Sequence, residues 1–349
     1  MKIGIITYWF NRGQATVGRF LRSSLENLGY EVFVFVRPDA SAGLTSTQDV
    51  WAQSNLHTGS GFHPKPQEYL KWSEDHELDA VFLFQNYSFT DIAELKNNGI
   101  TTIGCFMREN IGSNHVADIN KAYSLVYAVN PSDLVRMTEM GVKNVHPLKW
   151  MVHPSLIHEP KPLKPTDVPT FFYPGGYSSA RKAYSEVVEA FVGLETESRL
   201  IVKTIKSPRW PRMLGTSKGI TIINKELSTE EYSNLLGTVD VMIGIARWEG
   251  LGLHLYEAIG RGIPILGTDV NPINEVVGHH VTGALVDCIP RGKTSSDLPA
   301  CQHSVSKITS AMEYVLQNHE NLQRNQVAHR NKLNWDNFER ELSNLLSLV

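Results

Sequence analysis

The apolar positions of this chain alternate between short β-type runs and longer segments with helical spacing. The first run, 2–8, precedes a glycine-containing loop and then segment 19–29, whose apolar residues recur at helical spacing and which ends in a glycine. A second β-type run covers 30–36. This strand–helix–strand order predicts a parallel sheet.

The same alternation continues along the chain and is interrupted once. Segment 158–169, HEPKPLKPTDVP, has four prolines in twelve residues, which excludes a helix interior or a central strand. We interpret 159–169 as a linker between two Rossmann-like α/β domains, 1–158 and 170–333. Such sheets bind ligands beyond the carboxyl ends of their strands, so the predicted site lies in the cleft between the domains. Further predicted strands cover 79–84, 101–107, 125–130, 219–224 and 263–269.

The segment WEGLGLHLYEAIGRG, 248–262, follows a predicted buried strand and carries the most specific signal. Gly250, Leu251 and Gly252 fall in a turn, and a helix is expected from Leu253 to about 259. The N-terminus of a helix presents unpaired N–H groups and a partial positive charge. Because the glycines lack side chains, a phosphate could approach the backbone closely.

Two glutamates frame this turn and helix. Glu257 would lie about one turn into the helix, where its carboxylate is suited to accept both hydroxyls of a ribose. Glu249, in the turn, could reach the hydroxyls of a sugar. Alone, such a pair is more often two surface carboxylates; the glycines and the flanking strands favour a binding role.

The pattern E-G-x-G-x-x-x-x-E, followed by A-x-x-x-G-x-P-I, resembles the E-x7-E signature of the retaining GT-B glycosyltransferases of family four. The resemblance is strong over 170–290 and looser over 1–150. It implies a GT-B fold, in which two Rossmann-like domains face each other across a cleft and the last helix, here 334–349, crosses back onto the first. It also implies transfer of a sugar, with retention and without a metal, from a UDP- or GDP-sugar to an acceptor hydroxyl.

In the absence of a metal, side chains and helix dipoles must neutralise the diphosphate of the donor. The family supplies an arginine and a lysine from one loop, which here reads YPGGYSSARKAY. Lys182 matches the lysine; Gly176 or Tyr177 stands at the arginine position, and Arg181 is the candidate substitute. Arg181 and Lys182 are expected to stabilise the leaving diphosphate, although a solvated surface pair is the competing interpretation. Further candidate nucleotide contacts are Asn224 and a basic group of Lys203, Lys206 and Arg209.

The acceptor side departs from the family pattern. The family often has a histidine after the strand equivalent to 101–107, where this chain has Met107, Arg108 and Glu109. Arg108 and Glu109 are candidate acceptor or sugar contacts, and Gly13 is either a turn glycine or a point of close approach. The residue that assists the acceptor is not assigned, and lipid-linked saccharides, small metabolites and protein side chains stay open as acceptors.

Composition narrows the function and the location. A formal net charge of -3 with no long basic run argues against a nucleic-acid partner. No histidine spacing indicates a metal site, and no stretch approaches the roughly 20 apolar residues that span a bilayer. The three scattered cysteines argue against a disulfide or a zinc site, and the start of the chain does not resemble a secretion signal. We therefore expect a cytoplasmic enzyme, with contact to the inner face of the membrane left open.

Two other functions fit the same outline. A nucleotide-sugar epimerase of GT-B shape would need acid and base residues in the cleft, and the sequence offers no convincing set. A non-catalytic nucleotide-sugar-binding protein would fit the missing histidine. The oligomeric state and the identity of the sugar are not predicted.

Overall fold

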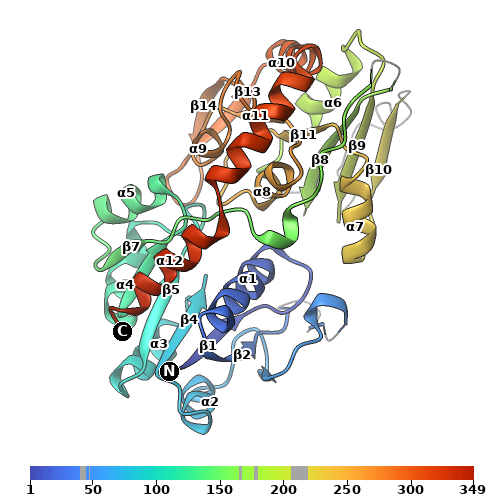
Figure 1. Ribbon diagram of the computed structural model, residues 1–349. Helices are drawn as coiled ribbons and strands as arrows, with labels where there is room; N and C mark the ends of the chain where they lie inside the picture. The colour runs from blue at the N-terminus through green and yellow to red at the C-terminus, as the bar shows by residue number, and fades with distance from the viewer. Residues whose placement is uncertain (40–44, 47, 165–166, 177–179, 206–218) are drawn as a thin grey trace. The chain divides into compact units, whose positions relative to one another are not determined.

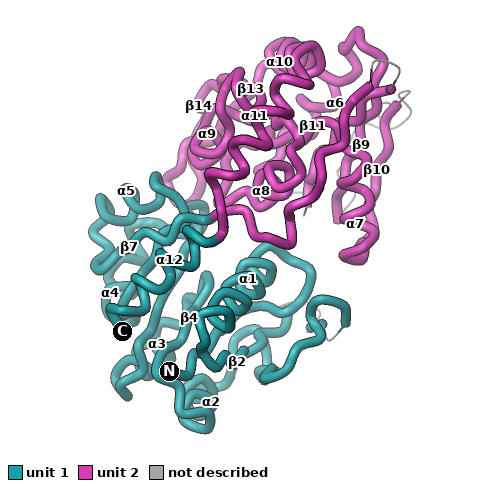
Figure 2. Tube along the Cα trace, in the orientation of Figure 1, with its two compact units in different colours: residues 1–150, 336–349 teal, residues 151–335 magenta. Residues whose placement is uncertain are grey.

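The computed structural model divides the chain into two compact units (Figures 1 and 2). It describes residues 1–349 except 40–44, 47, 165–166, 177–179 and 206–218. Unit 1 comprises Met1–Trp150 and Asp336–Val349, and unit 2 comprises Met151–Trp335. The chain was expected to divide near 158, before the proline-rich segment; the contacts divide it a few residues earlier.

Within its described residues, unit 1 holds a seven-stranded sheet with the order β3-β2-β1-β4-β5-β6-β7, and its neighbouring strands are parallel. Its strands are β1 (Lys2–Thr7), β2 (Glu31–Val36), β3 (Leu56–Thr58), β4 (Ala80–Phe84), β5 (Thr101–Cys105), β6 (Leu125–Ala128) and β7 (Val145–Pro147). The central strands are almost wholly buried, as the continuous apolar runs predict for a parallel sheet. The edge strands β3 and β7 were not predicted because three residues are too few to show a pattern.

The helices of unit 1 include one from the far end of the chain. They are α1 (Gly13–Asn27), α2 (Glu68–Asp75), α3 (Phe89–Asn97), α4 (Val116–Ala122), α5 (Pro131–Glu139) and α12 (Trp335–Leu346). On α12, the ring of Phe338 packs edge-on against Trp150 with centroids 5.4 Å apart, and both side chains are buried. The Glu341 carboxylate accepts a 2.6 Å hydrogen bond from the Lys149 N–H. The C-terminal helix thus packs with the first unit, as the GT-B resemblance implies (Figure 2).

Unit 2 repeats the architecture with a six-stranded parallel sheet in the order β10-β9-β8-β11-β12-β13, counted over its described residues. The strands are β8 (Thr170–Gly176), β9 (Arg199–Thr204), β10 (Ile220–Ile223), β11 (Val241–Gly244), β12 (Ile265–Thr268) and β13 (Gly283–Val286). The helices are α6 (Tyr184–Val192), α7 (Thr229–Leu236), α8 (Leu253–Gly260), α9 (Ile273–Val276), α10 (Val305–Gln317) and α11 (His319–Lys332). Helix α8 begins where the sequence predicts it. Because β8 and β11 are neighbours at the centre, the loops at their carboxyl ends meet.

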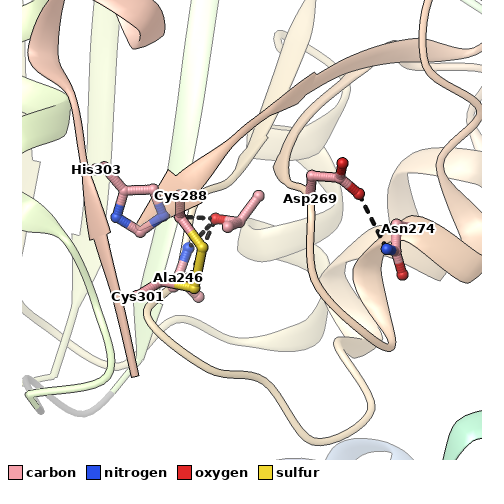
Figure 3. The surroundings of a disulfide bond; sticks show 7 residues. Ala246, Asp269, Asn274, Cys288, Cys301 and His303 are labelled. Atoms are coloured by element: carbon pink, nitrogen blue, oxygen red, sulfur yellow. Dashed lines mark hydrogen bonds between the residues drawn. A yellow bond between two sulfur atoms is a disulfide. The ribbon is translucent and has the colours of Figure 1, made fainter. Parts of the chain in front are cut away.

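A separate antiparallel hairpin follows β13 and corrects the interpretation of the cysteines. Strands β14 (Cys288–Lys293) and β15 (Pro299–His303) pair with each other, and Cys288 and Cys301 form a disulfide (Figure 3). The expectation of no disulfide was wrong because the hairpin brings residues 13 positions apart to a Cα–Cα distance of 5.4 Å. The third cysteine, Cys105, is buried in β5. The cysteine pattern therefore no longer supports a reducing compartment.

The packing of α12 yields a stability prediction. Replacing Phe338 with alanine removes a fully enclosed ring from its contact with Trp150 and should lower the free energy of unfolding by about 3–5 kcal/mol. Urea denaturation followed by circular dichroism measures this. Leu348→Ala, at a side chain that is 53% exposed, is the control and should change little. Equal midpoints for the two variants would show that α12 does not stabilise unit 1.

Candidate functional site

The loops after β8 and β11 are tied together by their backbones. The Arg247 N–H donates to the Arg181 carbonyl at 2.7 Å, and Lys182 pairs with Ala246 in an isolated antiparallel bridge. Buried Tyr173 on β8 also binds the loop after β11: its hydroxyl donates to the Ile245 carbonyl at 2.7 Å. These contacts place two loops that are more than sixty residues apart in sequence side by side.

As a result, three predicted catalytic residues converge in unit 2. The Arg181 guanidinium and the Lys182 ammonium both pair with the Glu249 carboxylate, Lys182 Nζ at 3.4 Å from Oε2. Lys182 and Glu249 are 4% and 3% exposed, whereas Arg181 is half-buried. Two cations around one anion leave this cluster of described residues with one surplus positive charge.

Burial and mutual attraction set the charges of this cluster. Burial lowers the pKa of Lys182 to about 8, although Glu249 opposes the shift. Burial alone would raise the pKa of Glu249, but Arg181 and Lys182 outweigh it and hold that pKa at about 2. At neutral pH the carboxylate is therefore ionised and the lysine is mostly protonated.

Helix α8 starts beside this cluster through a glycine. Gly252 is the N-cap of the helix and has a φ of +73°, a left-handed conformation that favours glycine. A Cβ at this position would also lie 2.9 Å from Leu255 Cδ1. The first turn of α8 has no acidic residue to offset the helix dipole. In the loop before the helix Leu251 is buried, and the Gly250 N–H donates to the Glu249 carboxylate at 3.1 Å.

Glu257 has different surroundings from Glu249. It is partly buried on α8, and its carboxylate accepts a 2.8 Å hydrogen bond from the Tyr232 hydroxyl on α7. Burial raises its pKa, and the hydrogen bond from Tyr232 works in the opposite direction. The sequence did not identify Tyr232, because the contact depends on the packing of α7 against α8.

The other predicted nucleotide contacts lie around the same sheet edge or beyond the described part of the chain. Gly176 ends β8, is exposed and has a φ of +57°. Asn224 is exposed and follows β10. Tyr177, Lys206 and Arg209 lie outside the described residues.

The predicted acceptor-side residues belong to unit 1. Gly13 is the exposed first residue of α1. Arg108 is buried and forms an ion pair with Asp133 at 2.9 Å, so a structural partner already occupies its guanidinium. Glu109 is partly buried next to it in sequence.

Two further side chains lie beside the Arg181–Lys182–Glu249 cluster: Arg247, which sequence reasoning missed, and His254, which it interpreted as a packing or capping residue. Arg247 donates from Nη1 to the Lys182 carbonyl at 2.7 Å and forms an ion pair with Glu186. Its position between the strand and Glu249 was a usable signal. Burial and Lys182 lower the pKa of His254 to about 3, which keeps the ring neutral, and its enclosed Nε2 has no hydrogen-bond partner among the described residues.

Neither a metal centre nor a membrane span is found in the described part of the chain. No grouping of three or more His, Cys, Asp or Glu side chains there could hold a metal ion. No described helix combines the length and the apolar character needed to cross a bilayer.

Part of unit 2 matches a known protein family. Residues 157–290 match the family Glycosyl transferases group 1. A curated relative, N-acetyl-alpha-D-glucosaminyl L-malate synthase of Bacillus anthracis, is 32% identical over 110 residues. That alignment covers 30% of this chain and 29% of the relative, so it spans less than a third of either protein. Residues 157–290 therefore resemble a glycosyltransferase domain of this family.

Solved structures resemble the chain over its full length. Sucrose-phosphate synthase from Thermosynechococcus elongatus has a TM-score of 0.76 at 14% identity, covering 100% of this chain and 98% of that one. Anabaena HepE in complex with UDP and glucose has a TM-score of 0.72 at 14% identity, covering 100% of both chains. The pneumococcal O-GlcNAc transferase GtfA in complex with UDP and GlcNAc has a TM-score of 0.72 at 12% identity, covering 99% and 98%. The predicted GT-B fold of two Rossmann-like domains is confirmed.

The ion cluster makes a prediction about stability. Glu249→Gln leaves the buried Lys182 ammonium without its counter-charge and should cost on the order of 3 kcal/mol. The same change should lower the pKa of Lys182 further, because the attraction that opposes burial is lost. Adding Lys182→Met should restore part of the stability in urea unfolding. Exposed Glu230→Gln is the control, and a Glu249→Gln protein as stable as this control would contradict the assignment.

Proposed function

We propose that this protein transfers a sugar from a UDP- or GDP-sugar to an acceptor hydroxyl, with retention at the anomeric carbon and without a metal. The observation that carries the proposal is the Arg181–Lys182–Glu249 cluster, which has a surplus positive charge and lies beside the start of α8. The cluster lies inside the segment that matches Glycosyl transferases group 1.

The donor diphosphate has the charge and the acceptor oxygens that this cluster would bind. Arg181 and Lys182 supply cationic N–H donors, and the first N–H groups of α8 add the positive end of a helix dipole. When the bond between the sugar and the diphosphate breaks, negative charge grows on the leaving phosphate oxygen. Groups fixed in advance around that oxygen lower the barrier, because they bind the transition state more strongly than the ground state.

In this proposal Glu249 orients groups rather than transferring a proton. A carboxylate with a pKa of about 2 is a weak base and is not available as an acid at neutral pH. It holds the two cations in place and can accept hydrogen bonds from the hydroxyls of the donor sugar. Retention then follows if the acceptor hydroxyl attacks from the side on which the diphosphate departs, which needs no carboxylate nucleophile.

Glu257 is assigned to the ribose of the nucleotide. Its carboxylate accepts one hydrogen bond, from Tyr232, and has lone pairs that can accept ribose hydroxyls as well. Gly250, Leu251 and Gly252 form the turn, and Leu253 begins α8. The diphosphate would approach the backbone of these four residues. Gly176, Lys206 and Asn224 complete the proposed nucleotide contacts.

The acceptor is proposed only by class. The relative from Bacillus anthracis is named for a malate product, a small molecule, and HepE and GtfA are solved with UDP and a sugar. These names favour a UDP-sugar donor together with a glycan or small-molecule acceptor. A lipid-linked acceptor is kept in the proposal on the family resemblance alone. Gly13, Arg108 and Glu109 are proposed for the acceptor side, with the Arg108–Asp133 pair limiting Arg108 to its remaining N–H groups. The same proposal includes a cytoplasmic location, with contact to the inner face of the membrane left open.

A panel of UDP- and GDP-sugars, with and without simple sugar acceptors, tests the activity. Slow release of UDP or GDP, unchanged by a chelator and abolished in Lys182→Ala, is the expected result. Lys307→Ala, at a lysine whose side chain is 57% exposed, is the matched control and should keep full activity. Binding without turnover would indicate a non-catalytic protein, and interconversion of the donor sugar would indicate an epimerase. Proton NMR of the product tests retention.

The assignment of Glu257 has its own test. Glu257→Ala should weaken binding of the nucleoside diphosphate by about 1.5–3 kcal/mol, because hydrogen bonds to a charged acceptor are lost. Isothermal titration calorimetry measures the affinity, with exposed Glu230→Ala as the control. Unchanged affinity in Glu257→Ala would remove this residue from the ribose site.

A further inference from the structure

Hairpin β14–β15, residues 288–303, contacts the loop that follows β11 in the proposed donor site. Most of the hairpin lies beyond the segment 157–290 that matches the family. Figure 3 shows its disulfide and His303 close to Ala246, which lies two residues after the end of β11. The hairpin therefore adjoins the loop that carries Glu249.

Two hydrogen-bonded connections join the hairpin to that loop. The Cys301 N–H donates to the Arg247 carbonyl at 3.0 Å. His303 Nε2 lies 2.9 Å from the Thr268 hydroxyl, which in turn receives the Ala246 N–H at 3.0 Å and donates to the Ala246 carbonyl at 3.1 Å. Both connections end on consecutive residues of one loop.

His303 is uncharged where it contacts Thr268. The ring is 5% exposed, and burial lowers its pKa to about 4, so it is neutral at physiological pH. If the Thr268 hydroxyl donates to the Ala246 carbonyl, it accepts from a protonated His303 Nε2. In this arrangement His303 is a neutral donor that holds Thr268 in register with Ala246.

The same loop also forms hydrogen bonds with the backbone of the two cationic residues. Arg247 donates its backbone N–H to the Arg181 carbonyl and a guanidinium N–H to the Lys182 carbonyl, both at 2.7 Å. The chain of contacts therefore runs from the hairpin through Arg247 to the backbone of Arg181 and Lys182. All of its members are in unit 2.

We propose that hairpin β14–β15 positions the donor-site loop and that the Cys288–Cys301 disulfide makes this positioning depend on redox state. The proposal rests on the donor-site assignment made above. A two-stranded hairpin is only marginally stable alone, and a covalent link restricts its unfolded conformations. Reduction by a dithiol transfers two electrons and two protons: the disulfide becomes two thiols and the reductant becomes a disulfide. The opened hairpin then releases Arg247 and Thr268.

The test compares the full-length protein before and after treatment with dithiothreitol. Reduction should raise the KM for the donor, and the Kd for UDP used as a probe, by about tenfold, with a smaller change in kcat, because misplaced groups bind the diphosphate less well. Amide hydrogen exchange in 245–250 should become faster. Cys288→Ser combined with Cys301→Ser should show the reduced behaviour under both conditions, whereas Cys105→Ala should still respond to the reductant. Thermal unfolding confirms that each protein is folded at the assay temperature.

A second pair of variants examines the positioning residue. His303→Leu should raise the donor KM and the exchange rate of 245–250, and His303→Gln, which keeps an N–H donor, should recover part of both. Equal UDP affinity and equal exchange in the oxidised and reduced proteins would overturn the proposal, as would faster exchange without any loss of affinity. If UDP binds in neither state, the donor assignment fails, and the exchange data alone decide whether the hairpin holds the loop.

Discussion

Two cations held against one buried carboxylate are the constraint on which the loop region of unit 2 depends. Removing Lys182 and Glu249 from water is costly, and their mutual attraction, that of Arg181 and the hydrogen bond from the Gly250 N–H offset the cost. The cluster can form only if the loops after β8 and β11 meet, which requires those strands to be neighbours. The sheet order provides this, and the backbone bond between Arg247 and Arg181 fixes it.

The same cluster explains why a stable arrangement is also suited to binding. One anion cannot neutralise two cations, so a positive charge is left next to the start of α8. A diphosphate would supply the missing negative charge and would meet N–H groups that are already oriented. Under the proposed function, structural stability and ligand affinity draw on the same three side chains, and a change in Glu249 should affect both.

The loop after β11 is held by residues that are distant in sequence. Tyr173, on the neighbouring strand β8, binds Ile245 directly after β11. The hairpin binds Arg247 and, through Thr268, Ala246. Each contact is modest alone, since a typical hydrogen bond contributes about 1 kcal/mol net. Together they restrict the loop to one position, and a binding site for a charged ligand needs that precision.

The sequence alone determined the alternation of strands and helices, the two Rossmann-like domains, the start of α8 and the position of Gly252 directly before that helix. These features follow from local patterns: apolar runs, helical spacing and glycine positions. Only the tertiary structure decided that Glu249 would lie between Arg181 and Lys182, that Tyr232 would bind Glu257, that Arg108 would pair with Asp133, and that Cys288 would bond Cys301. Each of those contacts depends on which strands and helices become neighbours, and that choice is made by the packing of whole elements rather than by the residues near any one position.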